Sequence, residues 1–229
     1  LSAFRLGYLS LPERARAEQL AWACARRIVK LLPQHDDMPE ELRSLRASLA
    51  STYYGNFSVF RSAPDTWAID QLFPVMPIHR LNEQPDQLGS IADLTCDSDG
   101  KLARFIEGGK SKTLLELHTP QEGEPYLLGL FLAGAYQEVM GNLHNLFGST
   151  NAVHIRLAPG GGYRLDHVVR GDTNAEVLQA MEHDPDLMLE RLRLASEEAI
   201  REGRLAVSDA RLLISHVSSS LQQSTYLQA

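Results

Sequence analysis

Apolar residues recur at helical spacing near the start of the chain. The stretch "PERARAEQLAWACARRIVKLL" begins at Pro12 and predicts a helix. One stripe of this helix carries Ala17, Leu20, Ala21, Cys24, Ile28 and Leu31. "MPEELRSLRASLAS" predicts a second helix with Pro39 near its first turn. "LPQHDD" is expected to be the loop between the two helices.

The last part of the chain, residues 172–229, also follows a helical pattern. "DTNAEVLQAMEHD" opens with Asp172 or Thr173 as a helix cap, and Glu176 stands where a capping box needs it. "DPDLMLERLRLASEEAIREGRL" and "SDARLLISHVSSSLQQSTYL" predict two further helices.

The middle of the chain has short apolar runs, such as "NFSVFRS", "FPVMPIHRL", "GSIADLTC" and "YLLGLFLAG", bounded by turn residues. "AVHIRLAPGGGYRLDHVV" predicts an antiparallel hairpin, and "AYQEVMGNLHNLF" predicts one helix. We therefore expect a mixed α+β fold with an antiparallel β-sandwich or barrel flanked by helices. The predicted domains are residues 1–50 (helical), 51–171 (the β-domain) and 172–229 (helical).

Composition and charge narrow the class of protein. The 229 residues are 44% hydrophobic and 22% charged, with a net charge of −7 and no basic stripe, which disfavours a nucleic-acid partner. No stretch approaches the ~20 apolar residues of a membrane span. Two cysteines cannot form a disulfide framework, which favours a reducing, cytoplasmic location. The start lacks Met and a secretory signal, so we expect a piece of a longer chain.

Reactive side chains gather in "LTCDSDG", where Cys96 lies beside Asp97 and Asp99 at the end of a predicted strand. An isolated Cys at a strand end is more often a small buried hydrophobe. However, carboxylates are seldom buried unpaired, and a strand end is well placed to face a site. Cys24 has no such neighbours, and its position on a helical stripe assigns it to packing.

Two other interpretations of "DSDG" deserve a test. A calcium loop fails because Thr95 and Ile106 stand where acidic ligands are required. A haloacid-dehalogenase-like phosphatase, with Asp97 as nucleophile and Asp99 helping to hold magnesium, is closer, because "GDTNAE" follows later. Lys101 replaces the expected Thr, and the preceding strand is not continuously apolar. This phosphatase remains the alternative hypothesis.

Other motifs carry less information. "PGGG" is a hairpin turn rather than a phosphate loop, because Walker spacing is absent. The histidines lack zinc-ligand spacing, and His144 is expected to be a satisfied core or interface residue. Tyr136, in "GAYQE", is either half-buried with a locally bonded hydroxyl or aimed at an anionic ligand, and chemistry alone leaves both open.

Three long stretches together resemble one family: "YYGNFSVFRSAPDTWAIDQLFPVMPIHRLNE", "LTCDSDGKLARFIEG" and "LGLFLAGAYQEVMGNLHNLFGSTNAVHI". They are similar to the C-terminal part of the biosynthetic arginine decarboxylases, pyridoxal-phosphate enzymes of the alanine-racemase-like fold type. The resemblance covers most of residues 50–229, and residues 1–50 look like the end of the family's helical-bundle insertion. It implies a preceding (β/α)-barrel with the Schiff-base lysine, which this chain lacks.

The resemblance also implies roles for the candidate residues. L-arginine would become agmatine and CO2 in polyamine biosynthesis, with Cys96 donating a proton to Cα across a homodimer interface. Asp97 would bind the guanidinium, Asp99 would assist or only cap the turn at Gly100, and Tyr136 would hold the cofactor phosphate. Magnesium is implied too, without an identifiable ligand set. This chain alone is then expected to be inactive. A non-catalytic interaction module is a further alternative.

Overall fold

The computed structural model describes residues 2–31 and 39–228, and the predicted loop "LPQHDD" lies outside these described residues. The chain opens with the helices α1 (Ser2–Arg5), α2 (Leu11–Leu31) and α3 (Glu40–Ser48). At the start of α2, the side chain of Glu13 accepts hydrogen bonds from both the backbone N–H and the hydroxyl of Ser10. The two helices predicted for this part are confirmed as α2 and α3.

The apolar stripe of α2 is not covered by the rest of the described chain. No α2 side chain is buried, and Leu20, Trp22 and Ile28 are all exposed. Cys24 is exposed as well, so its assignment to packing is wrong for the chain as it stands. The pattern correctly predicted a helix with an apolar stripe, but the stripe meets no core within these residues.

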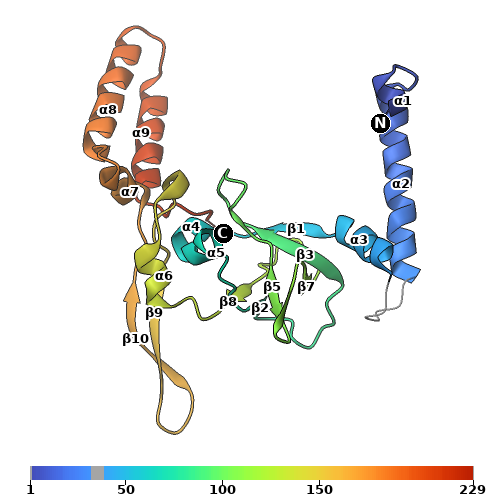
Figure 1. Ribbon diagram of the computed structural model, residues 1–229. Helices are drawn as coiled ribbons and strands as arrows, with labels where there is room; N and C mark the ends of the chain where they lie inside the picture. Colours follow the sequence, from blue (N-terminus) through green and yellow to red (C-terminus); the bar gives the residue numbers. More distant parts are fainter. Residues whose placement is uncertain (1, 32–38, 229) are drawn as a thin grey trace.

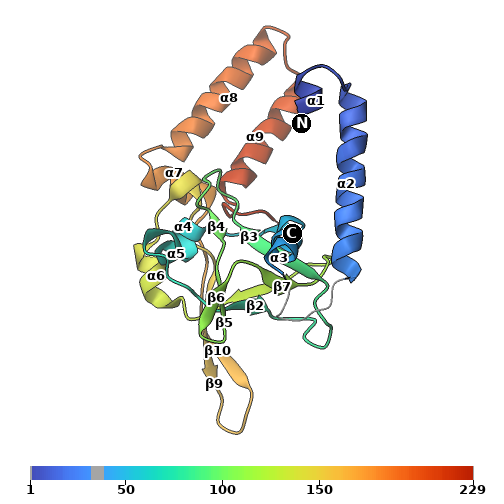
Figure 2. The same ribbon diagram turned by 45° about the vertical axis from the view of Figure 1, so that its right-hand side comes forward.

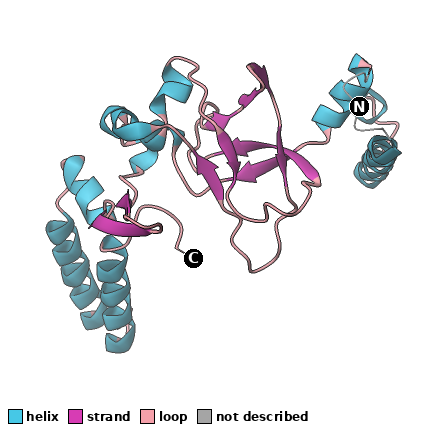
Figure 3. Cartoon of the chain, turned by 90° about the horizontal axis from the view of Figure 1, so that it is seen from below, coloured by secondary structure: helices cyan, strands magenta, loops and turns pink. Residues whose placement is uncertain are grey.

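The centre of the molecule is a four-stranded sheet built around β3 (Gln87–Ala92). On one edge, β3 pairs with β1 (Ser51–Tyr54) in parallel. On the other edge, two antiparallel strands share its length: β7 (Leu115–Leu117) pairs with its beginning and β4 (Lys101–Leu102) with its end. Figure 3 shows these strands in the middle of the molecule, between two groups of helices.

Three two-stranded antiparallel ladders complete the β-structure. They join β2 (Val75–Pro77) to β8 (Leu128–Leu130), β5 (Phe105–Glu107) to β6 (Lys110–Lys112) and β9 (Ala152–Leu157) to β10 (Tyr163–Val169). The hairpin predicted from "AVHIRLAPGGGYRLDHVV" is thus confirmed. Its turn uses Gly160, Gly161 and Gly162, all with positive φ, which L side chains rarely adopt.

The expected mixed α+β class is confirmed, with one departure from antiparallel pairing. Strands β1 and β3 run parallel because a long crossover separates them in the sequence. This crossover holds two short helices, α4 (Val59–Ser62) and α5 (Pro64–Ala68), and strand β2. A single sequence shows strand positions through alternation, but it does not show which strands become neighbours.

The hydrophobic core lies on this sheet. Phe105 and Leu117 are almost completely buried, and they pack in one cluster with Val59, Ile91, Leu102 and Leu115. Val59 belongs to α4, so the cluster joins the short helix to strands β3, β4, β5 and β7. Because α4 is part of the core, it is a rigid base for the residues that contact it.

Helices continue after the sheet. α6 (Gly134–Met140) and the 3₁₀ turn η1 (His144–Leu146) precede β9, and α7 (Asn174–Ala180), α8 (Pro185–Arg201) and α9 (Val207–Leu221) follow β10. Thr173 caps α7, and Glu176 completes the predicted capping box. The Glu176 side chain accepts the Thr173 N–H at 2.7 Å, and the Thr173 hydroxyl accepts the Glu176 N–H at 3.2 Å.

The C-terminal segment returns to the β-domain. Asn56 and Leu227 exchange two hydrogen bonds of 3.0 Å, from the Asn56 amide to the Leu227 carbonyl and from the Leu227 N–H to the Asn56 side-chain oxygen. Tyr226 stacks on Phe147, with ring centroids 5.3 Å apart, and donates to the Gly148 carbonyl at 2.8 Å. Burial raises the pKa of Tyr226 to about 12.

The described chain is elongated rather than compact. Helix α2 and the α8–α9 pair lie on opposite sides of the central strands (Figures 1 and 3), and the β9–β10 hairpin projects away from the body (Figures 1 and 2). The register places apolar side chains on one face of this hairpin, and all are exposed: Val153, Ile155, Leu157, Tyr163, Leu165 and Val168. Two-stranded hairpins are only marginally stable in water, so this face is suited to packing against another surface.

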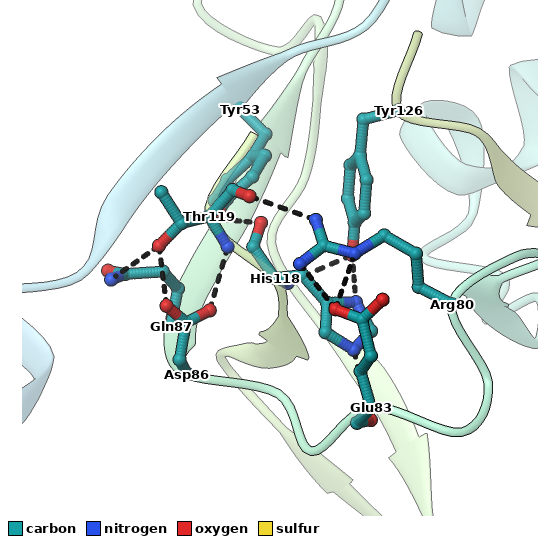
Figure 4. A network of polar contacts seen from close by, with 8 residues as sticks. All are labelled: Tyr53, Arg80, Glu83, Asp86, Gln87, His118, Thr119 and Tyr126. Atoms are coloured by element: carbon teal, nitrogen blue, oxygen red, sulfur yellow. Dashed lines mark hydrogen bonds and ion pairs between the residues drawn. The ribbon is translucent and has the colours of Figure 1, made fainter. Parts of the chain in front are cut away.

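A polar network fixes the segment before β3 to the end of β7 (Figure 4). His118 is almost completely buried; its Nε2 faces the Glu83 carbonyl at 3.2 Å, and its Nδ1 lies 2.9 Å from the Tyr126 hydroxyl. A carbonyl only accepts, so Nε2 carries the proton and Nδ1 accepts from Tyr126. The Arg80 guanidinium donates hydrogen bonds to both the Glu83 carboxylate and the Thr119 carbonyl.

Asp86 closes the other side of the same network. Its carboxylate accepts the Thr119 hydroxyl at 2.6 Å and the Thr119 N–H at 2.7 Å. These two hydrogen bonds hold the pKa of Asp86 below its ordinary value of 3.8. Asp86 therefore stabilises the fold in its ionised form.

The lowered pKa predicts how Asp86 contributes to stability as pH changes. The contribution is present above the unfolded-state pKa and is lost as pH falls through the lower folded-state pKa. We expect Asp86→Asn to lower the free energy of unfolding at about pH 6, and this deficit to shrink on acidification toward about pH 2.5. Urea unfolding across this range is the measurement.

Glu122→Gln is the control for this prediction, because Glu122 is exposed and lies outside the network. A deficit for Asp86→Asn that stays constant with pH would contradict the assignment.

Candidate functional site

The loop that carries the reactive residues is organised by a residue that sequence reasoning missed. Asp93 follows β3 directly and is only 2% exposed. One carboxylate oxygen accepts the Val59 N–H at 2.8 Å, and the other accepts the Thr95 N–H at 2.8 Å and the Thr95 hydroxyl at 2.7 Å. The Asp-x-Thr spacing after a strand is typical of such a turn and was the available signal.

Gly100 closes this loop because it leaves space for Asp93. A Cβ atom at Gly100 would lie 2.2 Å from the Asp93 carboxylate and 2.3 Å from the Thr95 hydroxyl. The Asp93 N–H donates to the Gly100 carbonyl at 2.8 Å, and the Gly100 N–H donates to the Asp97 carbonyl at 3.1 Å. The glycine is thus required for a close approach, not for the turn of the chain that the sequence suggested.

Cys96 lies at the exposed part of the loop with a free thiol. Its interpretation as a small buried hydrophobe is therefore wrong. Its backbone N–H donates to the side-chain oxygen of Asn145 at 3.0 Å. The backbone of Cys96 is fixed in this way, while its sulfur remains accessible to a reaction partner.

Asp97 lies beside His144. The distance between Asp97 Oδ2 and His144 Nε2 is 3.6 Å, close enough for an ion pair when the imidazole is protonated but too long for a hydrogen bond. Asp97 Oδ1 accepts the Asp99 N–H at 2.9 Å. This arrangement leaves Asp97 partly exposed, with one oxygen engaged by the loop and the other near an imidazole.

His144 differs from the expected satisfied histidine. Its ring packs on Phe60, with centroids 4.4 Å apart, yet its Nε2 atom is buried and makes no hydrogen bond within the described residues. The backbone N–H of His144 donates to the Asn142 side chain at 2.9 Å. The ring is therefore positioned by its backbone and by Phe60 rather than by a polar partner.

Asp99 belongs to a different part of the surface. It lines a cavity of about 210 Å³ together with Asp70, Lys101 and Arg104, and this lining includes neither Cys96 nor Asp97. The structure thus brings Cys96 to Asn145 and Asp97 to His144, both residues of η1, and it separates the side-chain surroundings of Asp99 from theirs.

Tyr136 stands on α6 with 63% of its surface exposed. Its hydroxyl makes no hydrogen bond to the residues that the structure describes, so its interpretation as a half-buried, locally bonded tyrosine is wrong. The neighbouring Gln137 is buried and anchors the helix: its amide donates to the Asp65 carboxylate at 2.7 Å, and its oxygen accepts the Asp65 N–H at 3.1 Å. Tyr136 is therefore an exposed phenol on a fixed helix.

The phosphatase hypothesis finds no support in this geometry. Its second motif would bring Asp172 toward Asp97 and Asp99 to hold magnesium, but Asp172 instead accepts the Ser149 N–H. Within residues 2–31 and 39–228, no three acidic, histidine or cysteine side chains gather as metal ligands. The described sheet also lacks the doubly wound parallel arrangement of those enzymes.

Every helix within the described residues is too short or too polar to cross a membrane.

Comparisons with known proteins all find the same kind of enzyme, and the matched residues cover the whole chain. Residues 1–46 match the family model of the arginine decarboxylase helical bundle domain, and residues 175–227 match that of the arginine decarboxylase C-terminal helical extension. The biosynthetic arginine decarboxylase of Synechococcus sp. (strain RCC307) is 70% identical over 228 residues, covering 100% of this chain and 36% of the relative. This chain corresponds to the C-terminal portion of biosynthetic arginine decarboxylases.

More distant decarboxylases share the same portion. The protein of Gloeobacter violaceus is 57% identical, with 99% of this chain and 36% of the relative covered. The crystal structure of the biosynthetic arginine decarboxylase of Campylobacter jejuni has a TM-score of 0.78 at 30% identity and covers 99% of this chain and 34% of that protein. The chain thus spans about a third of the length of these decarboxylases.

The close packing of Gly100 against Asp93 gives a testable prediction. We expect Gly100→Ala to lower the free energy of unfolding by about 1–3 kcal/mol, because the added methyl group must displace a buried carboxylate. Denaturant unfolding measures this loss. Ser98→Ala, at an exposed position of the same loop, is the control and should change the free energy by less than about 0.5 kcal/mol. Equal stability of the two variants would refute the role of Gly100.

Proposed function

We propose that this chain is part of an enzyme that converts L-arginine to agmatine and CO2 with pyridoxal phosphate, as a step in polyamine biosynthesis in the cytoplasm. The observation that carries this proposal is the pair Cys96–Asp97, an exposed thiol and a partly exposed carboxylate on a loop anchored by Asp93. The whole-length similarity to biosynthetic arginine decarboxylases supplies the reaction to which the pair is assigned.

Cys96 is proposed as the proton donor. Pyridoxal phosphate, when bound, accepts the electron pair that remains when the substrate loses its carboxylate. The Cα atom must then receive a proton, and an exposed thiol carries an S–H proton that it can donate. Its fixed backbone N–H limits the directions from which the sulfur approaches Cα.

Asp97 is proposed to bind the far end of the substrate. A carboxylate binds a guanidinium through two parallel charge-assisted hydrogen bonds, and this geometry favours arginine over a shorter diamine precursor. Asp97 follows Cys96 directly, and both contact η1, whereas Asp99 lines the neighbouring cavity with Lys101 and Arg104. The geometry supports a direct role for Asp97, and for Asp99 it supports a role in shaping the loop through its N–H bond to Asp97.

Tyr136 is proposed to bind the cofactor phosphate. Its phenol is exposed and without a partner among the described residues, while Gln137 holds the helix beneath it. A hydroxyl donor of this kind suits a phosphate oxygen. The chain's four lysines, Lys30, Lys101, Lys110 and Lys112, do not match the family's barrel motif, so the Schiff-base lysine is expected from the barrel that precedes this portion in the relatives.

The proposed site is completed across an interface in at least a homodimer. The candidate residues are exposed, and the apolar faces of α2 and the β9–β10 hairpin are uncovered, as expected when this part of the protein packs against other domains or subunits.

The proposed domains are residues 1–50, 51–171 and 172–229, in agreement with the start of β1 at Ser51 and the Thr173 cap of α7. We expect the 229-residue chain alone to be inactive. A magnesium requirement has no ligand set among the described residues.

The decisive experiment measures products from the full-length protein with L-arginine and pyridoxal phosphate. Cys96→Ala is expected to lower the rate of agmatine formation about 100-fold or more and to increase the aldehyde formed by misplaced protonation. Cys24→Ala is the matched control, because Cys24 is also exposed but lies on α2. Unchanged agmatine in Cys96→Ala would remove the thiol from the reaction. An inactive wild-type protein would favour a non-catalytic module.

The two aspartates are separated by a second measurement. We expect Asp97→Asn to raise the KM for arginine about tenfold or more, because one charge-assisted interaction with the guanidinium is lost. Asp99→Asn should change KM less than about threefold, since its side chain faces another cavity. Steady-state kinetics with arginine measure both values. A larger effect in Asp99→Asn would reverse the assignment.

A further inference from the structure

We infer that Asn145 is a positioning residue, which sets the direction from which the Cys96 thiol delivers its proton. The inference rests on the proposed function of Cys96 and extends it to a residue of η1. Asn145 contacts the site through one hydrogen bond, in which its Oδ1 atom accepts the Cys96 N–H at 3.0 Å.

The backbone at Asn145 explains why an asparagine suits this position. Asn145 has φ 52° and ψ 27°, in the left-handed region, and the next residue, Leu146, also has positive φ. Asparagine enters this region more readily than most L residues, and its short amide still provides an acceptor. Few side chains satisfy both demands, because glycine has no acceptor and alanine has neither the acceptor nor the backbone tolerance.

The hydrogen bond closes a ring of contacts around α4. On one side, Asp93 binds the Val59 N–H and the Leu94 N–H donates to the Phe57 carbonyl, which fixes the start of the loop. On the other side, the Asn142 N–H donates to the Phe60 carbonyl at 3.1 Å, and His144 packs on the Phe60 ring. The first branch starts from Phe57 and from Val59 of α4, and the second starts from Phe60 of α4. The Asn145–Cys96 bond joins their free ends.

The position of this bond predicts a selective effect. Tyr136 lies on α6, which is held separately by the pairing of Gln137 with Asp65, so loss of the Asn145 acceptor leaves that anchor in place. The anchors of Asp93 are likewise intact. Only the part of the loop that carries Cys96 gains freedom. The expected defect is therefore in the direction of proton delivery rather than in cofactor binding.

The chemistry of the step makes direction measurable. In the productive path, the thiol S–H bond breaks, the proton joins Cα, and the thiolate later takes a proton from water. If the proton did not reach Cα, the chemistry of pyridoxal phosphate would instead retain the substrate's amino group, and water would supply the oxygen of an aldehyde released from the substrate carbon. The ratio of aldehyde to agmatine thus reports where the proton went, independently of the total rate.

Two variants separate the hydrogen bond from the backbone conformation. Asn145→Gly tolerates positive φ and removes only the acceptor, whereas Asn145→Asp keeps an acceptor and is also tolerated at positive φ. In the full-length protein, we expect Asn145→Gly to raise the aldehyde-to-agmatine ratio about tenfold, with pyridoxal phosphate affinity changed less than about twofold. Asn145→Asp should restore most of the wild-type ratio. An unchanged ratio in Asn145→Gly would overturn the inference.

Comparison with Cys96→Ala distinguishes the inference from the function on which it rests. If Cys96→Ala changes the ratio and Asn145→Gly does not, the positioning role fails and the proton donor stands. If neither variant alters agmatine or aldehyde, the proposed function itself fails. The rate of Cys96 alkylation by iodoacetamide, measured in a Cys24→Ser background, is an independent readout: Asn145→Gly should change it at least about twofold and Asn145→Asp should change it less. Equal alkylation rates in wild type and Asn145→Gly would also count against the inference.

Discussion

The three hydrogen bonds to the buried carboxylate of Asp93 are the interaction on which the candidate site depends. A polar group this far from water is costly to leave unpaired, so its position is strongly determined by the donors of Val59 and Thr95. Val59 belongs to the hydrophobic core, and Thr95 directly precedes Cys96. The same carboxylate thus transmits the rigidity of the core to the reactive thiol.

This dependence explains why the reactive residues are exposed without being loose. The sheet and α4 support the loop from below, Gly100 lets the loop close on Asp93, and Asn145 holds its far end. Catalytic groups gain most from such support when their side chains still reach a partner. In the proposed enzyme, the half-site would be shaped within this chain before any contact with the barrel or with a second subunit.

Local sequence patterns predicted the parts of the fold that local interactions determine. The Thr173–Glu176 capping box depends on residues three apart, and the β9–β10 hairpin depends on alternation around a glycine-rich turn. The parallel pairing of β1 with β3 depends on residues more than 35 positions apart, and no local pattern encodes it. The prediction that Cys24 is buried was wrong for a related reason. The sequence shows that one stripe of α2 is apolar, but it does not show which residues would cover that stripe.

Local patterns also predicted only part of the candidate site. Cys96, Asp97 and Tyr136 were found because reactive residue types stand in motifs that resemble a family, whereas Asn145 offers no reactive group and becomes visible only through its contact with Cys96. Its distance of 49 residues from Cys96 hides this contact from spacing arguments. In the proposed enzyme, the motifs would therefore identify the reacting atoms, whereas the geometry that directs them would be set by long-range hydrogen bonds from otherwise ordinary residues. In the proposed reaction, that geometry would decide whether agmatine or the aldehyde is formed.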